Sequence, residues 1–383
     1  MINILFIHQS ADLYGSDKTL LQLLTNLDTS KFNPVVVIPL DGPLKEELEK
    51  NNIKVIISPV LKLYRKMFTP LNILLFFKQI KKGIQVLDEL NKEYKFDIIY
   101  SNTLAVLLGM IYARKRKIKH VWHVHEIIVH PKPIAFIFPK LLNKYADVVV
   151  CNSKATMDNL VFREKELENK TQVIYNGLKP QKDDFVKTAK QDLGFDNDDF
   201  IITLIGRINR LKGHKWMLHT FINNFQSNKN IKLVFVGSPV VGQEYYLEEI
   251  EQIISEKNLQ NQVKIVGFKK ELRPFLCLTD VLAVPSTEAE SFGLVALEAM
   301  LAKKPVIGSN HGGLTEIIVQ NETGFLVEPN DDVQLATAIQ KLYNNQELRI
   351  LLGNNGYDRA IKEFSEEKYL KSFEELFQHL KFN

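Results

Sequence analysis

Short runs rich in valine and isoleucine alternate along this chain with longer segments whose apolar residues recur at helical spacing. In the first half, the runs predict strands near 2–7, 34–38, 53–57, 97–101, 119–124, 147–151 and 171–175. The segments between them predict helices near 17–27, 43–51, 70–93, 103–113, 135–145 and 153–168. Because the runs are apolar on both faces and each precedes a helix, they indicate a parallel sheet covered on both sides.

The same pattern restarts after a turn-rich break at Asn176–Pro180, with strands expected near 200–205, 231–236, 263–267, 280–284, 305–308 and 324–327. A chain of 383 residues is also too long for one ordinary core. We therefore expect an α/β protein with two Rossmann-like, doubly wound domains that face a central cleft. The first would span 1–176 and the second 177–364, and a last helix at 365–380 would pack back on the first domain.

Charge is unevenly distributed between these halves. The formal net charge is +4, but residues 1–175 carry +8 and residues 176–383 carry −4. The basic first half should attract an anionic partner, such as a lipid surface or a phosphorylated acceptor. Three basic stretches, interleaved with Leu74–Phe77, add the hypothesis of peripheral contact with an anionic membrane: Tyr64–Phe68, Lys78–Lys82 and Arg114–Lys119. The alternative is that these cations lie at helix ends over an ordinary core face.

The start of the chain, the apolar run at 104–113 and the two cysteines together predict the cellular location. The start of the chain reads as a first strand, and the apolar run Leu104–Ala113 is too short for a bilayer, which needs about 20 residues. Cys151 and Cys277 lie in or beside apolar runs, as buried thiols of a reducing compartment do. We expect a cytoplasmic protein that can reach the inner face of the membrane.

Two glutamates at a strand-to-helix junction carry the first chemical signal. Glu290 and Glu298 are separated by seven residues; a buried strand is expected just before them, and a helix is expected to begin near Gly293. A helix N-terminus offers free backbone N–H groups that favour phosphate. Carboxylates before and within that helix can accept bonds from sugar and ribose hydroxyls. The arrangement suits a sugar attached to a nucleoside diphosphate.

A second signal follows the first strand of the second half. Gly206 ends that strand and permits close approach of a phosphate, and Arg207 and Lys212 can clamp its oxygens. Such charge-assisted bonds contribute roughly 1.5–3 kcal/mol each. The alternative for this loop alone is a pair of solvated cations.

Together these features resemble the retaining glycosyltransferases of family 4, which have the two-domain GT-B fold and include bacterial surface-polysaccharide enzymes. The resemblance covers nearly the whole chain. Its markers are Gly206-Arg207 with Lys212-Gly213, Val266-Gly267-Phe268, the Glu290 and Glu298 pair, Lys304–Gly308, Gly312-Gly313 followed by Glu316, and Asn321–Leu326.

The resemblance implies a role for each matching residue. Arg207 and Lys212 would bind the donor diphosphate, Glu298 the ribose hydroxyls, and Glu290 the hydroxyls of the transferred sugar. The remaining donor-binding residues would be Gly206, Phe292, Gly293 and Leu294 near the sugar and phosphates, and Gly267, Phe268 and Lys269 beside the base. The product would be α-linked from an α-linked donor, in cell-surface polysaccharide synthesis, with a glycan or lipid-linked intermediate as acceptor.

The first half should supply the acceptor side. The family places a histidine at the end of the strand near 119–124, and His125, followed by Glu126, is the better match, with His123 as the alternative. Gly15 and Ser16 correspond to a glycine-rich loop that approaches the donor phosphates, although this chain has Tyr14 where a first glycine is commoner. Asn102 is a further candidate to face the acceptor. His125, Arg207, Lys212 and Glu290 are the predicted catalytic group.

No metal or cofactor is expected. Asp196-Asn197-Asp198 matches the Asp-x-Asp metal motif of the other major glycosyltransferase architecture, but it lies in an acidic loop before a strand and is interpreted as a solvated turn. Histidines near residue 125 come mainly from one strand, which disfavours a metal site. Two other functions stay open: a nucleotide-sugar epimerase, which needs no acceptor, and a non-catalytic nucleotide-sugar sensor. Nucleic-acid binding has no supporting motif.

Overall fold

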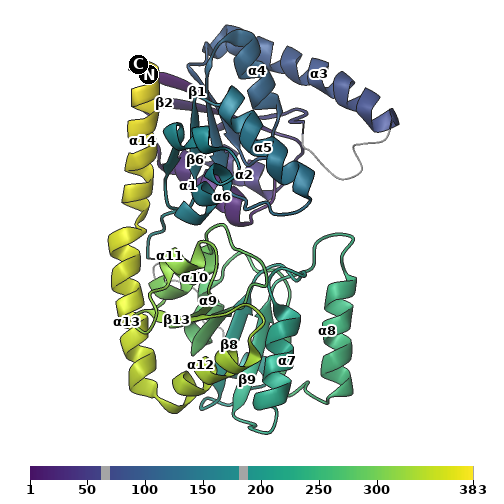
Figure 1. Ribbon diagram of the computed structural model, residues 1–383, viewed down its shortest axis with the longest axis vertical. Coiled ribbons are helices and arrows are strands. Elements are labelled where there is room, and N and C mark those ends of the chain that lie inside the picture. Colours follow the sequence, from purple (N-terminus) through teal and green to yellow (C-terminus); the bar gives the residue numbers. More distant parts are fainter. Residues whose placement is uncertain (62–69, 181–188, 383) are drawn as a thin grey trace. The chain divides into compact units, whose positions relative to one another are not determined.

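The computed structural model describes residues 1–61, 70–180 and 189–382. The chain divides into two compact units, Met1–Asn176 with Glu366–Asn383, and Gly177–Ser365. Each unit is built on a parallel β-sheet with helices around it (Figure 1). The expected α/β class with two doubly wound sheets is confirmed.

The sheet of the first unit has seven described strands in the order β3-β2-β1-β4-β5-β6-β7. Its strands are β1 (Ile2–His8), β2 (Phe32–Ile38), β3 (Lys54–Ile57), β4 (Ile98–Asn102), β5 (Lys119–Val124), β6 (Val148–Cys151) and β7 (Thr171–Val173). Its helices are α1 (Gly15–Asn26), α2 (Pro43–Lys50), α3 (Pro70–Tyr94), α4 (Leu108–Arg116), α5 (Lys132–Tyr145), α6 (Lys154–Val161) and α14 (Glu366–Phe382). The strand order reverses between β1 and β4, so the carboxyl ends of those two strands form the switch point where ligands bind in such sheets.

Both faces of this sheet are buried, as the apolar runs predict. In β1, Ile4 and Phe6 enter one core cluster, whereas Leu5 and Ile7 enter another. Successive side chains of a strand point to opposite faces, so the two clusters lie on the two faces of the sheet.

Helix α14 completes one of these cores. Phe373 and Phe377 are fully buried, and the Phe377 ring lies 6.1 Å from that of Phe6 and 6.0 Å from that of Tyr100. Tyr369 Oη donates to the carbonyl of Thr19 in α1 at 3.3 Å. Burying each ring contributes roughly 1.5–3 kcal/mol, so residues 366–382 are structural members of the first unit (Figure 1).

The sheet of the second unit has six described strands in the order β10-β9-β8-β11-β12-β13. They are β8 (Phe200–Ile205), β9 (Ile231–Val236), β10 (Val263–Val266), β11 (Val281–Val284), β12 (Val306–Ser309) and β13 (Gly324–Val327). The helices are α7 (His214–Asn224), α8 (Tyr245–Glu256), α9 (Arg273–Leu278), α10 (Leu294–Leu301), α11 (Leu314–Ile317), α12 (Asp332–Asn344) and α13 (Gln346–Glu363). Here the order reverses between β8 and β11.

Two helix predictions are wrong in their bounds. The helix expected at 103–113 begins only at Leu108, because Thr103 has a left-handed φ of 84° and the Leu104 amide donates to Glu126. The helix expected at 153–168 ends at Val161 and is followed by a separate 3-10 turn at Lys165–Asn169. Among the described residues, no helix combines the length and apolarity required to cross a bilayer.

The membrane-patch prediction is only partly covered by the structure. Tyr64–Phe68 lies outside the described residues, as do the side chains of Leu74, Leu75 and Phe77. Lys78 and Arg114–Lys117 are exposed.

Candidate active site

Two loops meet at the switch point of the second unit. One leaves β8 and runs from Gly206 to Gly213, and the other leaves β11 and runs from Pro285 to Gly293. Lys212 Nζ lies 2.6 Å from Glu290 Oε1, and both side chains are partly buried. The structure therefore brings together a predicted phosphate-binding cation and the first predicted carboxylate.

Glu290 is held as a carboxylate. Burial alone would raise its pKa, but the charge of Lys212 and hydrogen bonds from Lys212 and Ser286 together lower it. Ser286 Oγ donates to Glu290 Oε1 at 2.5 Å. The Ser286 carbonyl in turn accepts from His311 Nε2 at 2.9 Å. A charged carboxylate with fixed partners is suited to accept hydroxyl donors and to position Lys212.

Glycines allow these loops to lie against each other. Gly213 has a φ of 74°, and a β-carbon there would lie 1.8 Å from the Pro285 carbonyl oxygen. The Gly313 amide donates to the Glu290 carbonyl at 2.7 Å, and a β-carbon on Gly313 would lie 2.6 Å from the backbone of Phe292. Gly213, Gly312 and Gly313 are thus required by backbone packing around Glu290.

The helix that follows Glu290 begins as predicted at the glycine. Gly293 is the N-cap of α10 with a φ of 105°, and Leu294 is the first helical residue. The first amides of α10 point toward the N-terminal end without helical partners, which favours an anion there. The ring of Phe292 is 2% exposed and packs on Phe364 with centroids 5.8 Å apart, so it is an interior side chain.

The other predicted donor residues lie at the same end of this sheet. Gly206 and Arg207 follow β8, and Gly267, Phe268 and Lys269 form an exposed turn after β10. The Phe268 amide donates to Ser238 Oγ at 2.9 Å, and its ring is 43% exposed. Glu298 borders a cavity of about 50 Å³ with Arg273 and Lys179. A nucleoside-sized pocket formed by all of these residues remains a prediction.

In the first unit, four buried or half-buried side chains form a hydrogen-bonded chain across the switch point. His125 Nε2 contacts Asn102 Oδ1 at 2.8 Å, Asn102 Nδ2 contacts His8 Nδ1 at 2.9 Å, and His8 Nε2 contacts Asp17 Oδ1 at 2.6 Å. His8 and Asn102 are the last residues of β1 and β4. Asp17 lies in the first turn of α1 and also accepts from Ser10 Oγ and the Tyr14 amide.

The direction of these bonds determines the protonation of His125. Burial opposes ionisation of Asp17, but hydrogen bonds from His8, Ser10 and Tyr14 help to lower its pKa, so Asp17 only accepts. Asn102 Nδ2 also donates to the Ser16 carbonyl at 3.4 Å, which fixes its amide orientation. Hence Asn102 Oδ1 accepts from Nε2–H of His125, and Nδ1 of His125 carries the lone pair. Burial lowers the pKa of His125 to about 3, so the ring is neutral near pH 7.

The two candidate histidines differ in their surroundings. His123 is 1% exposed, contacts Tyr100 Oη through Nδ1 at 2.5 Å and packs against Phe373 of α14. His125 is partly exposed and belongs to the polar chain. The geometry therefore favours His125 over His123 as the reactive group. Gly15 and Ser16 open α1 beside that chain.

Sequence reasoning did not identify four polar members of these sites: His8, Asp17, Ser286 and His311. A polar residue at the carboxyl end of an apolar strand could have indicated His8. Asp17 could have been indicated as an acid in the first turn of the following helix.

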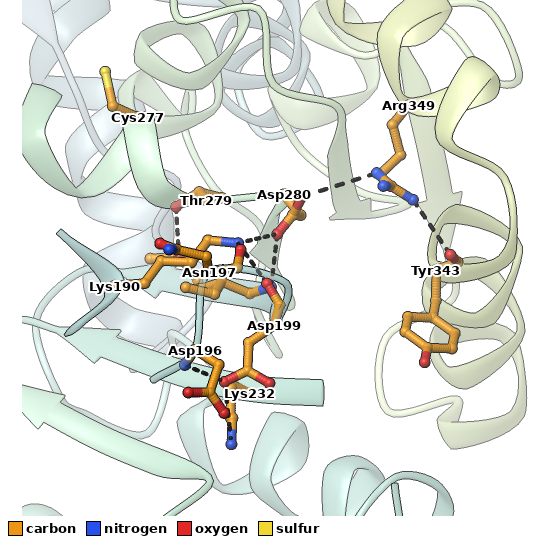
Figure 2. Close-up of polar contacts among 12 residues, drawn as sticks. Lys190, Asp196, Asn197, Asp199, Lys232, Cys277, Thr279, Asp280, Tyr343 and Arg349 are labelled. Atoms are coloured by element: carbon orange, nitrogen blue, oxygen red, sulfur yellow. Dashed lines mark hydrogen bonds and ion pairs between the residues drawn. The ribbon is translucent and has the colours of Figure 1, made fainter. Parts of the chain in front are cut away.

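The Asp196–Asp198 loop lies at the opposite end of the second sheet. It precedes β8, and the Asp196 amide donates to Asp199 Oδ2 at 2.8 Å (Figure 2). Asp199 pairs with Lys232 at 3.3 Å, and Asp280 with Lys190 at 3.7 Å and with Arg349 at 3.9 Å (Figure 2). Ligands bind at the carboxyl ends of parallel strands, whereas this loop lies at the amino end. We therefore assign it a structural role. Within the described residues no three His, Cys, Asp or Glu side chains group as a metal site.

Known proteins match this chain over both units. Residues 14–182 match the model described as Glycosyltransferase Family 4, and residues 185–359 match the model described as Glycosyl transferases group 1. An uncharacterized glycosyltransferase of Methanocaldococcus jannaschii is 27% identical, over 88% of this chain and 87% of its own. The capsular polysaccharide biosynthesis glycosyltransferase CapM of Staphylococcus aureus is 26% identical, over 79% and 81%.

A solved structure agrees with these matches. The crystal structure of Anabaena Alr3699/HepE in complex with UDP and glucose has a TM-score of 0.84 at 25% identity, covering 99% of this chain and 100% of that one. The two parallel sheets, their order and these matches give one conclusion. The chain belongs to the GT-B glycosyltransferases, with a first half of the Glycosyltransferase Family 4 type and a second half of the group 1 type.

Proposed function

We propose that this protein is a retaining, metal-independent glycosyltransferase that moves a sugar from a nucleoside diphosphate donor to a glycan or lipid-linked acceptor in cell-surface polysaccharide synthesis. The observation that carries the donor assignment is the contact between Lys212 and Glu290 beside the start of α10. It joins a cation for phosphate, a carboxylate for sugar hydroxyls and unpaired helix amides within one small region.

Each group has a defined task in the proposed reaction. The acceptor oxygen bonds to the anomeric carbon while the bond to the diphosphate oxygen breaks, on the same face of the sugar. The leaving phosphate takes the acceptor proton. Arg207, Lys212 and the amides at Gly293 and Leu294 stabilise the negative charge that develops on the diphosphate. Glu290 orients the transferred sugar, and Glu298 binds the ribose.

The first unit would meet the sugar through His125. A neutral ring whose Nδ1 is an acceptor can receive a hydrogen bond from a sugar hydroxyl, and the chain to Asp17 keeps the ring in that state. Gly15 and Ser16 would approach the donor phosphates from the start of α1. Gly206, Gly267, Phe268 and Lys269 complete the proposed donor contacts, and no cofactor takes part.

The relatives suggest which substrates to examine first. UDP and glucose are bound by Anabaena HepE, and CapM acts in capsular polysaccharide biosynthesis, so UDP-sugars and lipid-linked glycans are the first choices here. Basic segments Lys78–Lys82 and Arg114–Lys119 support the proposal of a peripheral contact with an anionic membrane at the cytoplasmic face.

The test is a panel of nucleotide sugars incubated with the protein, with and without lipid extracts, while release of the nucleoside diphosphate is measured. The proposal requires acceptor-dependent release that persists in a chelator and yields an α-linked product by NMR. Release of an altered donor sugar without acceptor would identify an epimerase instead. Nucleotide binding with no turnover on any donor would indicate a sensor.

A further inference from the structure

A basic hollow lies at the amino end of the first sheet, away from the candidate active site. Its volume is about 550 Å³, between the ends of α4 and α5 and the starts of β5 and β6. Strand β5 spans six residues, so the hollow lies about 17 Å along the sheet from the carboxyl end that carries His125. Its charged lining residues are Arg114, Lys117, Lys119, Lys144, Lys170 and Asp147.

Among residues 1–61, 70–180 and 189–382, the five cations of the hollow have no carboxylate partner. Within the described part of the chain, no ion pair joins any of them to an acid, Asp147 included. The Asp147 carboxylate instead accepts from the His120 amide at 2.7 Å. Lys170 Nζ donates to the carbonyls of Asn143 and Ala146, at 2.6 and 3.3 Å. The other four cations are exposed at the rim.

The second sheet provides an internal comparison. At its amino end the cations Lys190, Lys232 and Arg349 each face Asp199 or Asp280 (Figure 2). Cations in a structural role at this position are thus neutralised by the acids that precede the strands. The hollow of the first unit has the same kind of cations but a single acid, Asp147, and no ion pair among the described residues joins it to any of them.

The negative ends of the helix dipoles offset only part of the positive charge in the hollow. The ends of α4 and α5 each present about half a negative elementary charge. With Asp147 these amount to about two negative charges against five positive ones. His120, which lines the interior, is neutral near pH 7 because burial lowers its pKa to about 4. An excess of about three positive charges therefore remains in a concave surface, which concentrates the positive potential.

The lining also restrains these cations. The guanidinium of Arg114 lies 4.9 Å from the centroid of the Tyr145 ring, and Lys144 Nζ lies 5.4 Å from the same centroid. Lys170 is fixed by two carbonyls. Side chains that are already held lose less conformational freedom when they bind a ligand.

We propose that this hollow is a second anion site, which binds a ligand bearing two or more phosphate charges, separately from the donor site. Inorganic diphosphate and the phosphate headgroups of anionic lipids share that chemistry. The site does not depend on the transferase reaction proposed above, because it lies at the opposite end of the first sheet.

The test uses the full chain with isoleucine methyl labelling and NMR detection at low salt. The Ile118 methyl lines the hollow, whereas the Ile208 methyl lies in the loop after β8 and reports the donor site separately. Titration with inorganic diphosphate should shift the Ile118 signal saturably. The double variant Lys119→Glu with Lys144→Glu should weaken that binding at least tenfold.

The matched control is Lys115→Glu with Lys140→Glu, which makes the same charge change at two exposed lysines outside the hollow, one on α4 and one on α5. It should change the affinity less than threefold. Equal weakening by both double variants would overturn the proposal, since only net charge would then matter. An Ile118 signal that does not move would also overturn it, whatever happens at Ile208.

Vesicle sedimentation distinguishes the two sources of phosphate. Vesicles of phosphatidylglycerol in phosphatidylcholine should retain the wild type and the control, and lose the Lys119→Glu, Lys144→Glu variant, if the headgroup is the ligand. Diphosphate binding without vesicle binding would support the proposed site and indicate that its ligand is soluble.

Discussion

Lys212 and Glu290 lie 78 positions apart in the sequence, yet their charged atoms are 2.6 Å apart at the switch point of the second sheet. The contact links the loop after β8 to the loop after β11. Glu290 holds the Lys212 ammonium in place. A diphosphate would bind a cation whose position is already set, which reduces the entropy lost on binding.

The first prediction concerns these two side chains. Lys212→Ala should lower turnover at least about tenfold, because a charge-assisted bond to the leaving phosphate is lost. Glu290→Ala should impair transfer more than nucleotide binding. Lys215→Ala is the control, since Lys215 is exposed on the first turn of α7 and pairs with Glu249. Steady-state kinetics and nucleotide titration make the comparison, and wild-type transfer in both site variants would reject the assignment.

A glycine pair tests how tightly the two loops pack. Gly213→Ala would place a β-carbon 1.8 Å from the Pro285 carbonyl, so the loop carrying Lys212 must move. Gly242→Ala has a similar φ of 81° but meets nothing within 4 Å, so it carries backbone strain alone. We expect Gly242→Ala to cost about 1–2 kcal/mol of unfolding free energy. Gly213→Ala should cost more and weaken nucleotide binding, as measured by denaturant unfolding and titration; equal effects would contradict the packing argument.

The chain from Asp17 to His125 predicts one imidazole tautomer. In ¹⁵N-histidine-labelled protein near pH 7, His125 should carry its proton on Nε2 and none on Nδ1. Asp17→Asn removes the carboxylate that orients His8, so the Nε2–H form should lose population and turnover should fall at least about tenfold. Asp12→Asn, at an exposed acid in the loop that precedes α1, is the control. An unchanged His125 spectrum in Asp17→Asn would show that the chain does not set the tautomer.

Acid should destabilise the first unit more than the second. Burial lowers the pKa of His120 to about 4 and of His125 to about 3, and holds the pKa of His123 well below its usual value. The unfolded chain therefore binds these protons first as the pH falls below about 6.5, which favours unfolding. Glu126 acts in the opposite direction, because burial raises its pKa to about 7 and the folded state takes up that proton first. The three histidines together destabilise the folded first unit at acid pH by more than Glu126 stabilises it.

The second unit has one such residue, His214, whose pKa burial lowers to about 3. Between pH 7 and pH 5 the loss should be on the order of 4 kcal/mol for the first unit and 2 kcal/mol for the second. The first unit contains Trp122 and the second contains Trp216. The fluorescence of a Trp216→Phe variant therefore reports the first unit alone, and that of a Trp122→Phe variant reports the second. Equal acid sensitivity of the two fluorescence transitions would contradict this reading.

The sequence predicts the sheet well because strand signals are local. Runs such as Val35–Ile38 and Val281–Val284 are apolar on both faces, which leaves few alternatives to a central parallel strand. The start of α4 is not predicted in this way. Leu104–Ala113 is apolar throughout, so its pattern does not show at which residue the helix begins. The helix is delayed by two long-range hydrogen bonds: the Trp122 indole N–H donates to the Thr103 carbonyl, and the Leu104 amide donates to the Glu126 carboxylate.

The residues of the candidate active site also differ in how far the sequence predicts them. Gly206, Lys212, Glu290 and Gly293 form a recognisable order along the chain, so they could be selected without coordinates. His8 and Asp17 have only weak local signals, at a strand end and in a first helical turn, because their shared role arises only when β1 and β4 become neighbours and Asn102 bridges them. A hydrogen-bonded chain among four residues has no signature in spacing.

The position of α14 has a consequence for biosynthesis. Phe373 and Phe377 close the core of the first unit, but they follow the whole of residues 177–365 in the chain. At translation rates of about 5–20 residues per second, the nascent first unit would wait roughly 10–40 s with the aromatic face around Phe6 and Tyr100 uncovered. The second unit can mature earlier, so this protein should acquire its N-terminal half last and depend on chaperones during that interval.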